Sequence, residues 1–148
     1  AKEGNPTAFR FAMPDIAGFD YSFSGLKTSF LYRLRDEVAA NPHFIEQNKA
    51  DLCASLQKNI IDILLKKLIA ASQQLGIDNI AVAGGVSANS GLRRELIAQG
   101  NSRDWQVFIP KPAFTTDNAA MIAVAGYYKY LRGYLCDISR PPFARTSI

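Results

Sequence analysis

The sequence predicts a helix-rich α/β fold in a single domain of 148 residues. Apolar residues recur at helical spacing over long stretches, two short apolar runs are typical of buried strands, and glycine or proline lies between these segments. The composition, 48% hydrophobic and 20% charged, is ordinary for a globular protein. We expect no membrane segment, because no run approaches the roughly 18 apolar residues that a span requires, and no secretory signal.

The N-terminal half is predicted to consist mainly of two helices. Residues 1–20 are expected to form an extended or looping segment with at most one short strand. A helix begins near Ser24, with Ser22 or Ser24 as its cap, and ends at Asn41-Pro42. A second helix runs from about Asn48 to Leu75, and its wide apolar stripe indicates burial on more than one side.

The C-terminal half is predicted to alternate between strands and helices. The expected elements are a strand at 80–83, a helix from about Asn89 to Gln99, a strand at 107–109, a helix from about Asp117 to Gly133, and an irregular tail at 134–148. Gly76 and Gly100 are expected to end the helices before them. Two strands make a poor sheet, so either the N-terminal segment adds a strand or the chain is a piece of something larger.

The net charge and the two cysteines indicate the cellular environment of the protein but do not identify its function. The net charge of +4 suits an RNA-facing surface and equally an ordinary solvated surface. Cys53 and Cys136 have neither the spacing of a metal knuckle nor that of a disulfide framework. We therefore expect two free thiols in a reducing cytoplasm.

The most informative motif is Gly84-Gly85-Val-Ser-Ala-Asn89, which lies between a predicted strand and a predicted helix. Glycines without Cβ atoms allow a backbone to approach a nucleotide closely, and a helix N-terminus offers unpaired N–H groups to an anion. The structural alternative is a tight strand-to-helix turn without a ligand. For a lone glycine pair that alternative is the better interpretation.

Two further stretches carry candidate functional residues. For Asp117, which follows the second strand, two interpretations are open: either Thr116 or Asp117 caps the last helix, or Asp117 holds a metal ion at the sheet edge where α/β proteins bind ligands. The stretch from Tyr21 to Thr28 begins a helix and contains Ser24 and Lys27. These two residues are either an exposed helix start or a hydroxyl and a cation at the rim of a substrate cleft.

Together, the stretches YSFSGLKT, GGVSANSGLR and TDNAAMIAVAG, in this order, resemble the C-terminal half of one family. It is the bacterial tRNA N6-adenosine threonylcarbamoyltransferase family, long labelled O-sialoglycoprotein endopeptidase or glycoprotease. The resemblance covers nearly the whole chain and implies one half of a two-lobed actin-like, Hsp70-like ATPase fold with a nucleotide cleft between its halves. It also implies that the chain is a C-terminal fragment of a larger protein.

The resemblance implies roles for individual residues. Gly84 and Gly85 match glycines of the family's adenosine motif, and Asn89 matches a residue that contacts the adenylate-bearing substrate. Asp117 matches the carboxylate that completes a site for one divalent metal ion, iron or zinc. The other two ligands of that ion are a histidine pair outside this chain, and the single histidine here, His43, cannot replace them.

The resemblance also implies a reaction and its partners. In the family, the N6 amine of the adenosine next to the anticodon attacks the carbonyl carbon of threonylcarbamoyl-adenylate, and AMP leaves. The metal ion would polarise or orient the carbonyl-phosphate group. Implied partners are tRNA, an inactive paralogue of the same fold and a small P-loop ATPase. We expect this chain to be inactive alone, and an exposed hydrophobic face would favour its self-association.

Three other functions remain open at this point. A metal-dependent glycoprotease, as in the older label, finds no support in the sequence, which contains no H-E-x-x-H pair. A generic actin-like ATPase or sugar-kinase lobe would also use a strand, a glycine pair and a helix to bind adenosine. A non-catalytic interaction module would dock a partner through the long apolar helix.

Overall fold

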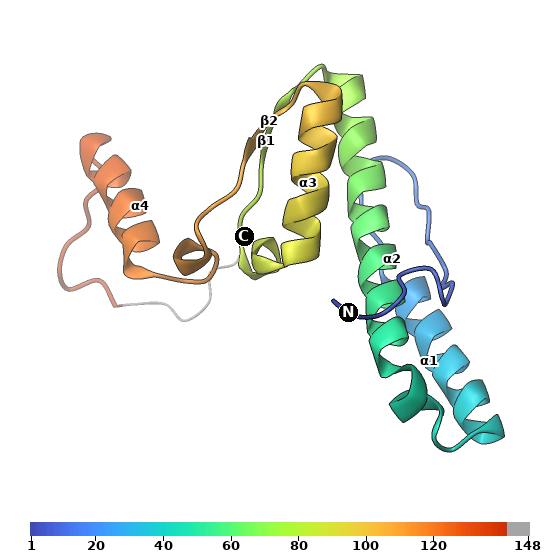
Figure 1. Cartoon of the computed structure of the whole chain (residues 1–148). Helices are drawn as coiled ribbons and strands as arrows, with labels where there is room; N and C mark the ends of the chain where they lie inside the picture. The colour runs from blue at the N-terminus through green and yellow to red at the C-terminus, as the bar shows by residue number, and fades with distance from the viewer. Residues whose placement is uncertain (142–148) are drawn as a thin grey trace.

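The structure, a computed structural model, describes residues 1–141, so the end of the expected irregular tail, 142–148, lies outside the described residues. The elements in chain order are α1 (Ser24–Ala40), α2 (Phe44–Leu75), β1 (Asn79–Ala81), the 3-10 turn η1 (Gly85–Ala88), α3 (Ser90–Arg103), β2 (Gln106–Phe108), the 3-10 turn η2 (Pro112–Phe114) and α4 (Ala119–Leu131) (Figure 1). The predicted helix-rich α/β class is confirmed. Within residues 1–141, no helix combines the length and apolar character needed to cross a membrane.

Helices α1 and α2 form a hairpin, and both predicted C-terminal ends are confirmed. The predicted cap of α1 is wrong: Phe23 occupies the N-cap position and no side chain caps the helix. Helix α2 begins at Phe44 rather than near Asn48, because the Phe44 N–H donates to the Asn41 carbonyl (2.9 Å) and the Phe44 ring is buried. Gly76 ends α2 in the left-handed conformation (φ 64°), as predicted.

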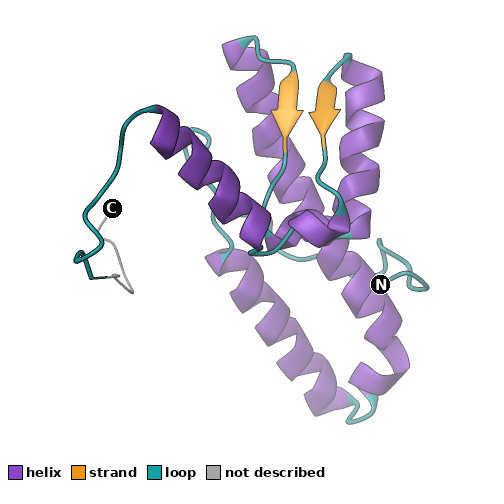
Figure 2. Cartoon of the chain, turned by 90° about the vertical axis from the view of Figure 1, so that its left-hand side faces the viewer, coloured by secondary structure: helices purple, strands orange, loops and turns teal. Residues whose placement is uncertain are grey.

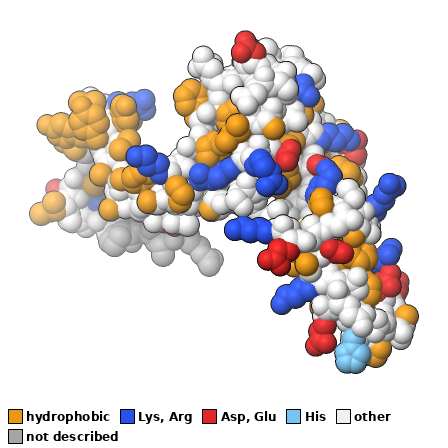
Figure 3. Space-filling model, viewed as in Figure 1, with side chains coloured by type: hydrophobic (Ala, Val, Ile, Leu, Met, Phe, Trp, Pro, Cys, Tyr) orange, Lys and Arg blue, Asp and Glu red, His pale blue; other side chains and the backbone are white. Residues whose placement is uncertain are grey.

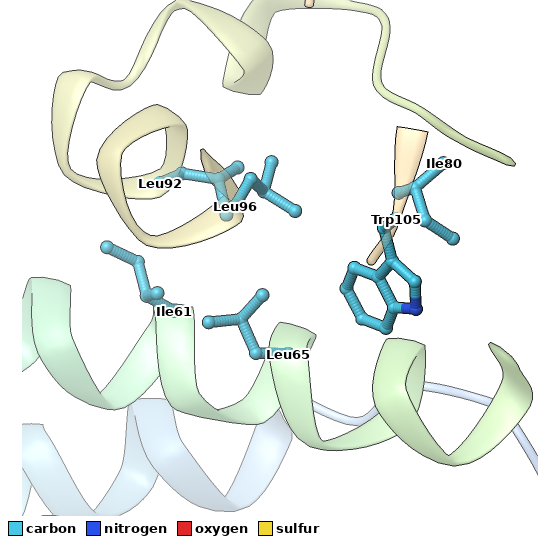
Figure 4. Close-up of a cluster of buried hydrophobic side chains, with 6 residues drawn as sticks. All are labelled: Ile61, Leu65, Ile80, Leu92, Leu96 and Trp105. Carbon is cyan, nitrogen blue, oxygen red and sulfur yellow. The ribbon is translucent and has the colours of Figure 1, made fainter. Parts of the chain in front are cut away.

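Helix α2 is buried on two sides, as its wide apolar stripe predicts. One cluster of buried side chains joins α2 to α1 and the N-terminal segment, and comprises Phe11, Leu26, Phe44, Leu52 and Ile63. The second joins α2 to α3 and the sheet, and comprises Ile61, Leu65, Ile80, Leu92, Leu96 and Trp105 (Figure 4). The two clusters make α2 the central element of the packed part of the chain.

The strands β1 and β2 pair in parallel, with Ala81 opposite Phe108, and the Val82 N–H continues the pairing by donating to the Phe108 carbonyl (3.1 Å). Helices α2 and α3 lie on the same side of this sheet (Figures 1 and 2). Ile80 is buried, whereas Phe108 is 55% exposed. Residues 1–23 add no strand, so within the described residues the sheet is two-stranded. Parallel sheets are usually covered on both faces, whereas the helices of residues 1–141 cover only one face of this sheet.

Gly100 does not end α3, contrary to the prediction. The helix continues to Arg103, and Asp104 is its C-cap in the left-handed conformation (φ 58°). Gly100 is buried, and a Cβ atom there would lie 2.6 Å from Cγ2 of Val107. The glycine therefore allows α3 to approach β2 closely, a role that sequence alone does not distinguish from a helix stop.

Helix α4 stands away from the rest of the molecule (Figure 1). It lies within the predicted range, 117–133, but none of its residues is buried. The residues that follow it, 134–141, contain no helix or strand, as expected for that part of the tail.

Candidate functional site

The candidate site lies where β1 and β2 end. Because the strands are parallel, their C-terminal ends lie at the same edge of the sheet, where open α/β sheets bind ligands. The chain leaves β1 into the turn that contains Gly84, Gly85 and Asn89, and leaves β2 into the loop that contains Asp117 (Figure 1). The two predicted motifs therefore follow neighbouring strand ends.

The glycine turn has a backbone conformation that requires glycine at its first position. Gly84 has φ 78° and ψ 174°, a combination open essentially to glycine alone. Its carbonyl accepts hydrogen bonds from the N–H (3.0 Å) and the hydroxyl (2.7 Å) of Ser87, which is buried. A Cβ atom on Gly85 would meet nothing within 4 Å. Among residues 1–141, the N–H groups of Gly84 and Gly85 have no hydrogen-bond partner, so both remain able to donate to a ligand.

Asn89 is the N-cap of α3, and its side chain is held at both ends. Its Oδ1 accepts from the Leu92 N–H (3.0 Å), and its Nδ2 donates to Oε1 of Gln57 on α2 (3.2 Å). One amide N–H of the half-buried Asn89 therefore remains for another acceptor. Gln57 was not found by sequence reasoning, because no motif surrounds it.

A hollow of about 300 Å³ lies beside this turn. Asn89 and Gln57 line it together with Val86 and Leu92, and it is completed by Ala1 and by α2 side chains that are mostly apolar. A mostly apolar hollow with few polar groups is typical of ligand sites.

Asp117 lies in the loop before α4 and is exposed. The prediction that Thr116 or Asp117 caps α4 is wrong: the cap is Asn118, whose Oδ1 accepts from the Met121 N–H (3.1 Å). Among the described residues, the Asp117 carboxylate has no hydrogen bond or ion pair. The structural alternative weighed for this residue, capping of the last helix, therefore does not account for it.

The described part of the chain does not assemble a metal site. Within residues 1–141, no three His, Cys, Asp or Glu side chains lie together in a way that could hold a metal ion. His43 is exposed between α1 and α2. Cys53 and Cys136 are both free, as predicted, and both are exposed. The exposed carboxylate of Asp117 could by itself supply one oxygen ligand to a metal ion.

Ser24 and Lys27 lie exposed in the first turn of α1. Helix α1 packs on α2 and makes no comparable contact with α3 or the strands. The structure therefore does not bring these two residues to the glycine turn.

The segment before α1 is held against α2 by charged side chains. Lys66 donates to the Asp15 carboxylate, and together with Lys67 holds the pKa of that carboxyl below its usual value of 3.8. Lys67 also donates to the carbonyls of Ile16 and Gly18. Burial raises the pKa of Tyr21. The contacts of Lys66 and Lys67 hold the segment before α1 in place. They lie outside the glycine turn and the Asp117 loop.

Comparison with known proteins places the chain in a family. Residues 1–124 match the family described as tRNA N6-adenosine threonylcarbamoyltransferase. Enzymes of that name from Porphyromonas gingivalis, Phocaeicola vulgatus and Riemerella anatipestifer are 61%, 54% and 50% identical to this chain over its whole length. The chain spans only 43%, 44% and 43% of their respective lengths. The resemblance seen in the sequence is thereby confirmed, and the chain belongs to the tRNA N6-adenosine threonylcarbamoyltransferase family as a part of its full length.

Proposed function

We propose that this chain is the part of a tRNA-modifying transferase that binds the adenylate of its substrate. The full-length protein would transfer a threonylcarbamoyl group from threonylcarbamoyl-adenylate to N6 of the adenosine next to the anticodon. The observation that carries this proposal is the position of the two motifs in a chain of this family: each motif follows the C-terminal end of one of two paired parallel strands. A tRNA substrate makes the cytoplasm the expected location.

The residues of the chain have distinct proposed tasks in this reaction. The transfer forms a bond between N6 and the carbonyl carbon, breaks the bond between that carbon and the phosphate oxygen, and releases AMP and one proton. The unpartnered N–H groups of Gly84 and Gly85 would hold the adenylate. The remaining amide N–H of Asn89 would orient the substrate. Among residues 1–141, no Ser-His or Cys-His nucleophile pair is present, and this reaction requires none.

Asp117 is the one proposed metal ligand in the chain. Its free carboxylate fits an oxygen ligand of iron or zinc, and a bound ion would act as a Lewis acid on the reacting group. Within residues 1–141 no three potential ligands lie together, so the remaining ligands would have to come from outside those residues.

The open surfaces of the chain support the proposal that it is one lobe of a larger actin-like fold. Helix α4 has no buried residue. The side chain of Phe108 is exposed, so one face of the sheet is not covered by the described residues. The chain also covers less than half of each relative named above. The remainder of the protein would cover these apolar surfaces and complete the nucleotide cleft. An inactive paralogue and a small P-loop ATPase are proposed partners of the complete enzyme.

The test uses the full-length protein that carries this sequence, with unmodified tRNA, threonylcarbamoyl-adenylate and the proposed partner proteins. Asp117→Asn is expected to lower transfer about a hundredfold or more and to reduce bound iron or zinc measured by elemental analysis. Asp36→Asn, which removes an exposed carboxylate on α1, is the control and should change neither quantity.

Other outcomes would favour the other functions. Full transfer activity and full metal content in Asp117→Asn would refute the ligand role. ATP hydrolysis by the wild-type protein without any transfer would favour the actin-like ATPase, and peptide cleavage would favour the glycoprotease. Binding of a partner without any of these activities would favour an interaction module.

A further inference from the structure

We infer that Arg93 is a positioning residue that holds the glycine turn and the Asp117 loop in a fixed relation to each other. The Nε–H of Arg93 donates to the carbonyl of Ser87 (2.5 Å), and Nη2 donates to the carbonyl of Pro110 (2.8 Å). The inference rests on the proposed function, because it assigns these two turns to one site.

The two carbonyls belong to the two candidate site segments. Ser87 lies between Gly84 and Asn89, and Pro110 lies just after β2 at the start of the loop that leads to Asp117. Among residues 1–141, no other side chain donates hydrogen bonds to both segments. One guanidinium therefore links the ends of both strands beyond their backbone pairing.

The chemistry of the link requires an arginine. A guanidinium is planar and presents several N–H donors in a rigid fork, so that two of them reach two acceptors at once. A lysine ammonium is a flexible point charge and does not reproduce that geometry. Arg93 is half-buried and lies in the first turn of α3, where a positive charge is disfavoured by the helix dipole. Its contacts with the two carbonyls account for a cation at this unfavourable position.

The turn that Arg93 holds is otherwise closed on itself. The N–H and hydroxyl of Ser87 both donate to the Gly84 carbonyl, which leaves the Ser87 carbonyl for Arg93. The Asp117 loop is closed on itself in the same way: Thr115 is buried, and its N–H (3.2 Å) and its hydroxyl (2.8 Å) both donate to the Pro112 carbonyl. Without Arg93, each segment keeps its local hydrogen bonds and loses the side-chain link to the other.

The adjacent Arg94 provides a matched control. Its side chain is 76% exposed, and its charged contact is to Glu95 at 3.9 Å. Arg93→Met and Arg94→Met remove the same charge from neighbouring positions of one helix. Arg93→Lys keeps the charge and removes the fork, and it provides a second variant if Arg93→Met folds poorly.

Two measurements on the full-length protein test the inference. Hydrogen exchange should become about tenfold faster in both 84–89 and 111–117 for Arg93→Met, with the interior of α3 unchanged. Threonylcarbamoyl transfer should lose about tenfold to a hundredfold in kcat/KM, mainly through a higher KM for threonylcarbamoyl-adenylate. Arg93→Lys should resemble Arg93→Met, and Arg94→Met should resemble the wild type.

Three results would overturn the inference. Faster exchange in only one segment, or throughout α3, would make Arg93 a local stabilising residue. Wild-type activity in Arg93→Lys would indicate that its charge, not its fork, acts on the substrate. Unchanged hydrogen exchange in Arg93→Met would show that Arg93 does not hold the two segments together. The exchange measurement needs no catalysis, so a wild-type protein without transfer activity would refute the proposed function while the link itself was still tested.

Discussion

Two regions of this chain use apolar side chains in opposite ways. The body, residues 1–109, contains every buried hydrophobic residue among those described, and all of them except Ala54 fall in two clusters that share α2. The arm, residues 110–141, contains the apolar helix α4, which has no buried residue. Its exposed side chains gather on the surface over α4 (Figure 3), and include Met121, Ile122, Val124, Tyr127, Tyr128, Tyr130 and Leu131.

The same difference divides the candidate site. Asn89 belongs to the body, where the α3 backbone and Gln57 hold its side chain. Asp117 belongs to the arm, where its loop is tied to the body through Arg93 at Pro110. Asn89, a proposed substrate-binding residue, is therefore held by contacts within this chain, whereas Asp117, the proposed metal ligand, precedes a helix that has no buried residue.

The largest expected contrast comes from truncating one apolar residue in each region. Leu96, in the body, is 1% exposed, and Ile122, in the arm, is 76% exposed. For the chain studied alone, Leu96→Ala should lower the free energy of unfolding by about 3 kcal/mol, because it leaves a cavity between α2 and α3. Ile122→Ala should change it by less than about 0.5 kcal/mol. Chemical denaturation followed by the fluorescence of Trp105 measures both values.

The full-length protein sharpens this comparison. If the remainder of the protein covers α4, Ile122→Ala should there lower the free energy of unfolding by about 1 kcal/mol or more. An equally small effect in the chain and in the full-length protein would contradict the proposal that the arm is covered. Self-association of the isolated chain, measured by sedimentation, would show that a second copy competes for the same surface.

The sequence predicted the elements of the body better than it predicted their ends. Periodic apolar residues mark α1 and α2 because burial on one or two sides leaves a repeat in the sequence. The cap of α4 is mispredicted because three adjacent polar residues, Thr116, Asp117 and Asn118, are equally suitable by type. The backbone conformation selects one of them, and here it selects Asn118.

The candidate site was predictable in its motifs but not in its contacts. The glycine pair and Asp117 stand out by their place after two strands. Gln57 and Arg93 act through partners at sequence separations of 32 and 17 residues, and no local pattern marks such pairs. The sequence also does not predict whether α4 packs against another part of this chain, because an apolar helix has the same residue pattern whether its packing partner is inside or outside the chain.

Two glycines in helices provide a second contrast, because replacing each by alanine is expected to change the stability of the protein in opposite directions. Gly100→Ala in α3 would place a Cβ atom 2.6 Å from Val107 Cγ2, and overpacking typically costs about 1–3 kcal/mol. A gain of about 1 kcal/mol in helix propensity offsets part of this, so a net loss of about 1 kcal/mol is expected. Gly126→Ala in α4 meets nothing within 4 Å and should stabilise that helix by about 0.5–1 kcal/mol.

Unfolding midpoints and the hydrogen exchange of each helix measure this pair. Gly100→Ala should speed exchange across α3 and β2, and Gly126→Ala should slow exchange in α4 alone. Stabilisation by Gly100→Ala would show that α3 and β2 can separate slightly at no cost. Destabilisation by Gly126→Ala in the isolated chain would show that α4 packs against a surface that the structure leaves open.

The smallest contrast concerns two identical caps. Asn89 caps α3 and Asn118 caps α4, each by accepting a backbone N–H three residues further on, at 3.0 and 3.1 Å. Replacing either by alanine should cost its own helix about 1 kcal/mol. Because α3 packs on α2 and β2, Asn89→Ala should lower the stability of the whole body, whereas Asn118→Ala should leave body unfolding unchanged.

The loss at Asn118 should instead be confined to α4. That helix has 13 residues and no buried side chain, and isolated helices of about this length are marginal in water. Asn118→Ala should therefore speed hydrogen exchange in 119–131 and leave 90–103 unchanged, with Asn118→Ser restoring the cap. A cooperative loss of stability in both ranges would show that the arm and the body unfold together. The division between them would then be one of exposure and not of folding.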